Sequence, residues 1–146
     1  MKGRELHKYY LCILIGALDE PKGTLEGYLF KDEKKNRVYV RRQPCPGAKT
    51  IRTRYRTLGY RNGLTLAEVE LLTGRTHQIR AHFASIGHPL LGDWLYGQED
   101  RDLIPRPALH SHRLELTHPV TRRRLTVTAP LPEDMARLLP EDMNKS

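Results

Sequence analysis

The first strong hydrophobic pattern in the chain is the continuous run Tyr9–Ile15, which ends at Gly16. A short apolar run rich in β-branched and aromatic residues predicts a strand that is buried on both faces. Central strands usually follow edge strands along a chain. We therefore expect the neighbours of this strand to come from sequence that precedes it.

Two shorter strands are expected next. Gly23–Phe30 and Arg37–Arg42 flank a polar turn over residues 31–36, and two prolines predict a loop over residues 43–47.

The segment Lys49–Leu58 alternates between hydrophobic and polar side chains, as a half-buried strand does. The turn residues Asn62 and Gly63 separate it from Leu64–Leu72, so the two segments predict a hairpin. The polar face of the first strand carries three arginines, which are Arg52, Arg54 and Arg56. They form either a solvated sheet surface or a stripe that tracks phosphates, and alternation alone does not decide between these.

After Gly74 the hydrophobic spacing becomes helical. A helix is expected to begin near Thr76, to bury Ile79, Phe83 and Ile86 on one stripe, and to end at Gly87. Later segments predict two more strands, Ser111–Thr117 and Leu125–Thr128, and a short helix or turn over residues 130–139. The pattern as a whole predicts an α+β fold, with a mostly antiparallel mixed sheet and few helices.

Charge points to a polyanionic partner. The 146 residues include 25 Lys and Arg against 17 Asp and Glu, which gives a formal net charge of +8 and a pI near 9.7. Such an excess favours nucleic acid, because cationic side chains release counterions from phosphates. No apolar stretch is long enough to span a membrane. Cys12 and Cys45 are too few for a disulfide framework, so a reducing, cytoplasmic setting is expected.

Two arginines near the predicted helix have the chemistry of a binding site. Arg75 lies at the helix N-terminus, where unpaired backbone N–H groups favour an anion such as phosphate. Arg80 borders the apolar stripe, so we expect it to be half-buried and to need a carboxylate or phosphate partner. No acidic residue of the chain is an obvious partner by its sequence position.

The segment that contains these arginines resembles a family signature. Gly74-Arg75-Thr76-His77-Gln78-Ile79-Arg80, followed by Gly87-His88-Pro89 and Gly92-Asp93, is similar to the motif of the RluA-family RNA pseudouridine synthases. Lys8-Tyr9-Tyr10 resembles the Lys-x-Tyr strand of that family, and Leu109–Leu114 with His118-Pro119 resembles its closing strand. The spacings agree along nearly the whole chain.

The resemblance implies a partial pseudouridine synthase fold, with residues 1–146 forming the C-terminal part of a single catalytic domain. It implies conversion of uridine to pseudouridine in RNA without a metal or organic cofactor, and ribosomal RNA is favoured over transfer RNA. Tyr10 corresponds to the tyrosine that packs against the flipped base, and Arg80 to the arginine that pairs with the catalytic aspartate. Arg75, His77 and Gln78 correspond to positions that line the cleft and are expected to contact RNA, together with the arginine stripe.

The nucleophilic aspartate of the family is not in the chain. It belongs to a His-Arg-Leu-Asp motif that precedes the Lys-x-Tyr strand, and the seven residues before Lys8 contain no aspartate. The segment His112-Arg113-Leu114-Glu115 is not a substitute, because it follows the helix and fits a half-buried strand. We therefore expect a fragment of a longer enzyme that does not make pseudouridine by itself.

Two other functions are compatible with the sequence. One is a non-catalytic RNA-binding module, whose phosphate contacts would include the three stripe arginines, Arg75 and residues 122–124. The other is a metal site formed by His110, His112 and His118 with His82 or His88, which is disfavoured because such histidines are more often surface or packing residues.

Overall fold

The computed structural model describes residues 6–75, 77–97, 104–118 and 120–138. Seven strands form one sheet in the order β3-β2-β4-β5-β1-β6-β7, and all six strand pairings are antiparallel. The strands are β1 (Leu6–Ile15), β2 (Lys22–Asp32), β3 (Arg37–Arg41), β4 (Lys49–Arg61), β5 (Leu64–Leu71), β6 (Leu109–Thr117) and β7 (Arg124–Thr128). The helices are α1 (Gln78–Ser85) and α2 (Glu133–Ala136). The α+β prediction is confirmed.

Strand β1 is central, as its apolar run predicts, and Cys12, Ile13 and Leu14 have no exposed surface. Its neighbours, however, are β5 and β6. The expectation that they come from preceding sequence is therefore wrong. Both neighbours follow β1 in the chain: β5 comes after β2, β3 and β4, and β6 comes after α1.

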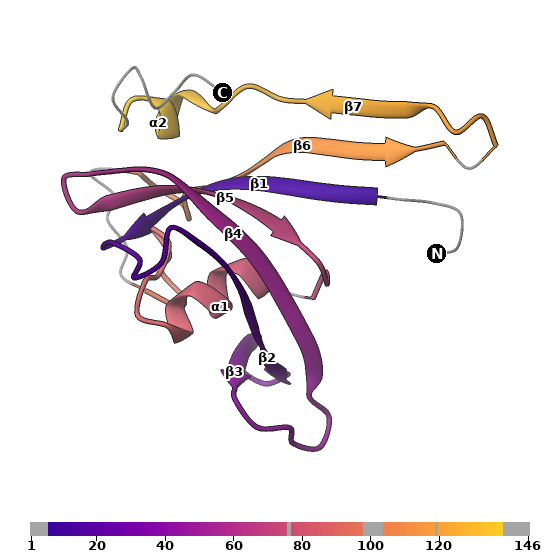
Figure 1. Ribbon diagram of the computed structural model, residues 1–146. Coiled ribbons are helices and arrows are strands. Elements are labelled where there is room, and N and C mark those ends of the chain that lie inside the picture. Colours follow the sequence, from indigo (N-terminus) through magenta and orange to yellow (C-terminus); the bar gives the residue numbers. More distant parts are fainter. Residues whose placement is uncertain (1–5, 76, 98–103, 119, 139–146) are drawn as a thin grey trace.

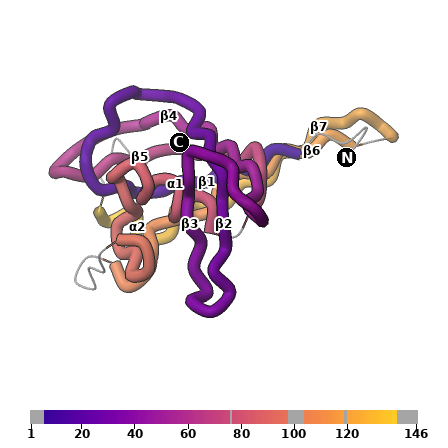
Figure 2. The backbone as a smooth tube through the Cα atoms, turned by 90° about the horizontal axis from the view of Figure 1, so that it is seen from below, coloured from indigo at the N-terminus to yellow at the C-terminus, as the bar shows by residue number. Residues whose placement is uncertain are grey.

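The two faces of the sheet carry separate hydrophobic clusters. On one face, α1 covers β4, β5 and β1 (Figure 1), and Phe83 packs with Cys12, Tyr55 and Val69. On the other face, Met135 of α2 packs with Leu11 and other apolar side chains. Figure 2 shows the β2–β3 and β6–β7 hairpins projecting away from this body in different directions.

Helix α1 ends as expected but buries less of its stripe. Gly87 has a φ of +86°, its N–H donates to the carbonyl of Ala84, and the His88 N–H donates to that of Phe83. These two hydrogen bonds define a Schellman motif, which favours glycine at this position. Ile86 lies in the cap and is 42% exposed, so its predicted place in the core is wrong.

Candidate active site

A cleft of about 330 Å³ opens where the end of β5 and the start of α1 face the middle of β1. It brings together five residues that the sequence singles out, which are Tyr10, Arg75, His77, Gln78 and Arg80. The apolar side chains of Leu71, Ile79 and Leu109 complete its walls. The combination of apolar walls and a few convergent polar groups is typical of a ligand site.

Tyr10 enters the cleft from β1. It is half-buried and lies on the same face of the strand as Cys12 and Leu14, the face covered by α1. The pairing of β1 with β6 shifts register between Tyr9 and Tyr10. Within the described residues the Tyr10 hydroxyl has no hydrogen-bond partner in the chain, so it is available to a ligand.

Arg80 does have a carboxylate partner within the chain, and the partner is Asp93. The Arg80 Nε and Nη2 atoms donate to the two carboxylate oxygens of Asp93, each at 2.9 Å. The Asp93 residue is fully buried and the Arg80 side chain is 12% exposed. Sequence position makes no acid an obvious partner of Arg80, and the folded chain supplies one in Asp93.

The geometry of this ion pair leaves one edge of the guanidinium unused. Asp93 takes the Nε–Nη2 edge, while Nη1 and the second hydrogen of Nη2 have no partner within the described residues. The guanidinium carbon lies 4.9 Å from the ring centre of Trp94 and 5.3 Å from that of Tyr96. Arg80 is thus held by a carboxylate and two aromatic rings while it lines the cleft.

Asp93 is also the centre of a tight turn. Its Oδ1 atom accepts hydrogen bonds from the backbone N–H groups of Leu95 and Tyr96, at 3.0 and 3.1 Å. Burial alone would raise the pKa of Asp93, but the hydrogen bonds from Arg80 and these amides outweigh it and hold the pKa below its ordinary value. Asp93 is therefore an anion at neutral pH, and its carboxylate fixes the turn through the two amides.

Gln78 holds together the backbone segments beside the cleft through its side-chain amide. Its Nε2 donates to the Arg52 carbonyl and to Thr53 Oγ1, and its Oε1 accepts from Thr73 Oγ1 and the Arg75 N–H. Both donors and both acceptor sites of the buried amide are used. In this conformation Gln78 acts on the site by fixing the turn at Arg75, whose own side chain is exposed.

His77 begins α1 with a left-handed backbone, φ 54°. Its Nδ1 atom lies 2.9 Å from the hydroxyl of Tyr96, which also accepts the N–H of Val38. Burial and the nearby charge of Arg80 lower the pKa of His77, so its ring is neutral at pH 7. In its neutral form the ring can accept a hydrogen bond from the Tyr96 hydroxyl at Nδ1 and present Nε2–H to the cleft.

The arginine stripe does not belong to this cleft. Thr53 and Tyr55 face α1, so the stripe residues between and beside them face the opposite side of the sheet. Each is paired with a carboxylate, and the pairs are Arg52–Glu26, Arg54–Glu70 and Arg56–Glu68. Sequence alternation predicts the separation of the two faces but not which of them carries the cleft.

The described residues contain no group of three or more His, Cys, Asp or Glu side chains placed to hold a metal ion. His112 pairs with Glu68 at 2.8 Å, and His110 lies 3.2 Å from the Ala129 carbonyl oxygen. In the described part of the chain, no helix has the length and apolar character needed to cross a bilayer.

Solved structures identify the fold. The human RNA pseudouridylate synthase domain containing 4 superimposes with a TM-score of 0.70 at 19% identity, over 90% of this chain and 60% of its own. The human RNA pseudouridylate synthase domain containing 1 gives a TM-score of 0.69 at 27% identity, over 86% of this chain and 54% of its own. The architecture is thus that of part of a pseudouridine synthase domain.

The model of the RNA pseudouridylate synthase family matches residues 1–85, and the chain belongs to this family. It is 39% identical over 140 residues to the uncharacterized RNA pseudouridine synthase YhcT of Bacillus subtilis, covering 94% of this chain and 45% of that protein. It is also 39% identical over 148 residues to the ribosomal large subunit pseudouridine synthase D of Nitrosomonas europaea, covering 95% and 42%. The chain spans less than half the length of these relatives.

Proposed function

We propose that the chain is the C-terminal part of a single catalytic domain that isomerises uridine to pseudouridine in RNA. Its cleft supplies Tyr10 to pack against the flipped base and Arg80 to orient a catalytic carboxylate. The names of relatives that act on the ribosomal large subunit favour ribosomal RNA as the substrate. The observation that carries the proposal is the convergence of Tyr10, Arg75, His77 and Arg80 on one cleft.

The free edge of Arg80 is the feature that suits it to this role. A guanidinium binds a carboxylate most strongly through two parallel N–H···O bonds. Since Asp93 uses only the Nε–Nη2 edge, the Nη1 side remains for a second carboxylate. Asp93 itself is not the nucleophile of this proposal, because it is fully buried and its oxygens are engaged by Arg80 and two amides.

Among the described residues, those that line the cleft include no carboxylate. The nucleophile is therefore expected from sequence outside these 146 residues, and the chain by itself is expected to be inactive. The reaction breaks the C1′–N1 bond, joins C1′ to C5 of the base and releases the C5 proton. Incubation of the chain with RNA that carries 5-tritiated uridine should release no tritium to water, and release at a rate typical of an enzyme would refute the inactivity.

A longer protein in which a His-Arg-Leu-Asp segment precedes residue 1 should release tritium. The same protein with that aspartate changed to asparagine should not. Tyr10→Phe and Arg80→Gln in the active form should each lower the rate, whereas Lys34→Gln, in the exposed β2–β3 turn, should leave it nearly unchanged. Equal losses in all three variants would contradict the placement of the active site in the cleft.

A non-catalytic RNA-binding module is the second candidate. The observation in its favour is the Arg80–Asp93 pair, because the chain neutralises its buried arginine without any external carboxylate. This candidate predicts salt-dependent RNA binding by the chain and no tritium release by any longer protein. RNA affinity that does not change with salt would count against both candidates.

A further inference from the structure

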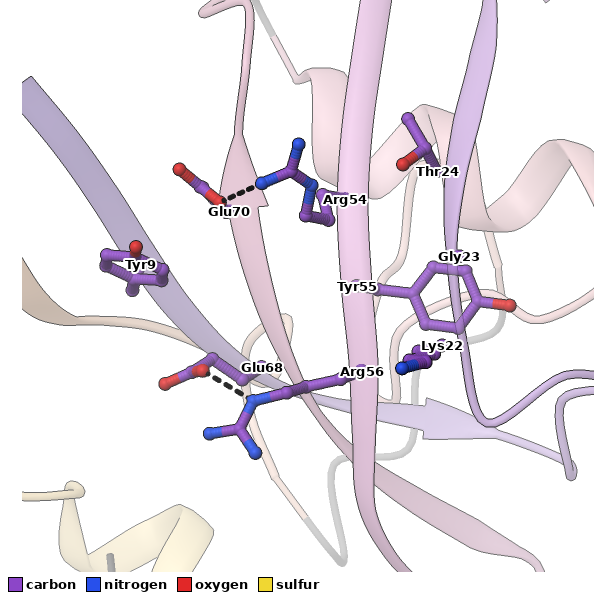
Figure 3. A pocket seen from close by; sticks show the side chains of 9 residues that line it. All are labelled: Tyr9, Lys22, Gly23, Thr24, Arg54, Tyr55, Arg56, Glu68 and Glu70. Carbon is purple, nitrogen blue, oxygen red and sulfur yellow. Dashed lines mark hydrogen bonds and ion pairs between the residues drawn. The ribbon is translucent and has the colours of Figure 1, made fainter.

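A second hollow, of about 460 Å³, lies on the face of the sheet opposite α1 (Figure 3). Strands β2, β4, β5 and β1 contribute its lining. The lining residues are Tyr9, Lys22, Gly23, Thr24, Arg54, Tyr55, Arg56, Glu68 and Glu70. None of them lines the cleft described above, so the two sites are separate.

Two arginines in this hollow are held in place by buried carboxylates. Arg54 Nη1 donates to Glu70 at 3.1 Å, and Arg56 Nε donates to Glu68 at 2.9 Å. Figure 3 shows both side chains reaching from β4 toward β5 to make these contacts. The carboxylate side chains are only 9% and 7% exposed, whereas those of Arg54 and Arg56 are 56% and 59% exposed. The buried carboxylates of Glu70 and Glu68 therefore hold the exposed guanidiniums of Arg54 and Arg56 in place.

Each of these guanidiniums keeps most of its donors. Arg54 and Arg56 use one nitrogen each, so two nitrogens of each have no partner within the described residues. The carboxylates, by contrast, have further basic partners. Glu70 also pairs with His7, and Glu68 also pairs with His112 and lies 3.5 Å from Arg113. The spare hydrogen-bonding capacity of the hollow is thus that of a donor surface for an anion.

Lys22 adds a positive charge that no described residue neutralises. It stands directly opposite Arg56 in the pairing of β2 with β4, and it has no ion-pair partner among the described residues. Like charges directly opposite one another on neighbouring strands are destabilising. Because Glu68 already pairs with Arg56, an anion bound between Lys22 and Arg56 would chiefly compensate the charge of Lys22.

We propose that Lys22, Arg54 and Arg56 form a phosphate-binding site for the RNA backbone on the face of the sheet opposite the cleft. The proposal rests on the proposed function, because it is the RNA substrate that supplies the phosphates. Alternate residues of β4 lie about 7 Å apart, so Arg52, Arg54 and Arg56 present a row of charges longer than one phosphate. Tyr9 lines the same hollow, but the Arg113 guanidinium carbon lies 4.0 Å from the centre of its ring and covers one face of it, so Tyr9 is not counted in the site.

The test compares two lysine variants of the chain. Lys22→Gln removes one charge from the hollow without removing an ion pair, and Lys34→Gln removes the same charge from the exposed β2–β3 turn. Binding of a short fluorescent oligouridylate is followed by anisotropy at several KCl concentrations. Lys22→Gln should weaken binding about two- to fivefold and reduce the slope of log affinity against log salt by about 0.7, while Lys34→Gln changes neither. Equal effects of the two changes would overturn the site.

Amide chemical shifts separate this site from the cleft. Titration of the chain with the same RNA should shift the backbone amides of Thr24 and Arg56 as well as those of Gly74 and Arg75. Shifts confined to Gly74 and Arg75 would overturn the second site and leave the proposed function intact. No shifts at either place would overturn both. Arg54→Gln gives an independent check, and full retention of affinity and salt slope in that variant would also refute the site.

Inorganic phosphate and poly-L-glutamate distinguish the source of the anion. If the RNA backbone is the ligand, the oligouridylate should shift the Thr24 and Arg56 amides at far lower concentration than either of these. Equal potency of inorganic phosphate would overturn the assignment to RNA. Tighter binding of poly-L-glutamate would assign the surface to an acidic protein instead.

Discussion

Replacement of Asp93 by asparagine tests whether the buried ion pair is what holds Arg80 in place. The change keeps the shape of the side chain and an Oδ1 atom for the amides of Leu95 and Tyr96. It removes the negative charge and one of the two acceptor oxygens that face Arg80. Removal of one partner of a buried pair costs about 3–5 kcal/mol, and an asparagine that still accepts one hydrogen bond lowers this to about 2–3 kcal/mol.

Asp32 provides a matched control. Its Oδ1 atom accepts the backbone N–H groups of Lys34 and Lys35, two and three residues further on, just as Asp93 does with Leu95 and Tyr96. No arginine pairs with Asp32 among the described residues. Asp32→Asn should therefore change the free energy of unfolding by no more than about 0.5 kcal/mol.

Urea denaturation near neutral pH measures both variants, and a double-mutant cycle with Arg80→Gln isolates the pair. We expect a coupling energy above about 1.5 kcal/mol between Asp93 and Arg80. Because the pKa of Asp93 is lowered by folding, its contribution is present above the pKa of the unfolded chain and is lost as pH falls through the folded value. The difference between wild type and Asp93→Asn should therefore shrink below about pH 4. A loss no greater than that of Asp32→Asn would refute the reasoning.

Three further substitutions test the surroundings of the cleft by the same denaturation assay. Gly92→Ala should lower the free energy of unfolding by at least about 3 kcal/mol, because a Cβ on this left-handed residue would collide with the Arg106 carbonyl oxygen. The control Gly63→Ala, at a similar positive φ but with open space around it, should lower it by about 1 kcal/mol. Similar losses in the two variants would contradict crowding at Gly92. Gln78→Ala should cost about 3 kcal/mol because it strips partners from a buried network, and a loss below about 1 kcal/mol would argue against a structural role. Burial lowers the pKa of His82 to about 4, whereas in the unfolded chain it is about 6.5. The folded state therefore disfavours the protonated ring, and the free energy of unfolding should fall by about 3 kcal/mol as pH falls from about 6.5 to about 4. His82→Gln should remove that part of the pH dependence, and parallel pH curves for the two proteins would refute it.

Local patterns in the sequence predict most of the strands and helices, but they do not predict which strands pair with each other. The apolar run of β1 and the Asn62-Gly63 turn are read from a few adjacent residues, and both are confirmed. That β6 completes the other side of β1 depends on a pairing across about a hundred residues, such as Tyr9 with Arg113. Alternation indicates that a residue faces one side of a sheet, but pairing of distant strands is decided by packing of the whole domain.

The same limit applies to the site. The need of Arg80 for a partner follows from its place beside an apolar stripe, yet Asp93 lies thirteen residues away, beyond the end of α1. The Gly92-Asp93 motif indicates a turn. Only the folded structure shows that Oδ1 of Asp93 fixes this turn while both carboxylate oxygens bind Arg80. Gln78 is similar, since a buried amide with four partners cannot be distinguished in sequence from one that contacts a ligand.

The central place of β1 in the sheet has a consequence for synthesis on the ribosome. Strand β1 emerges first among the described strands, but its two partners end only at Leu71 and Thr117. One edge of this apolar strand can therefore pair once Leu71 has been synthesised, but the edge that pairs with β6 stays unpaired until Thr117 has been synthesised. Such strands are prone to aggregation. Slower elongation through β5 and β6 should lower the yield of folded protein, and a chaperone that covers β1 during this interval should restore it.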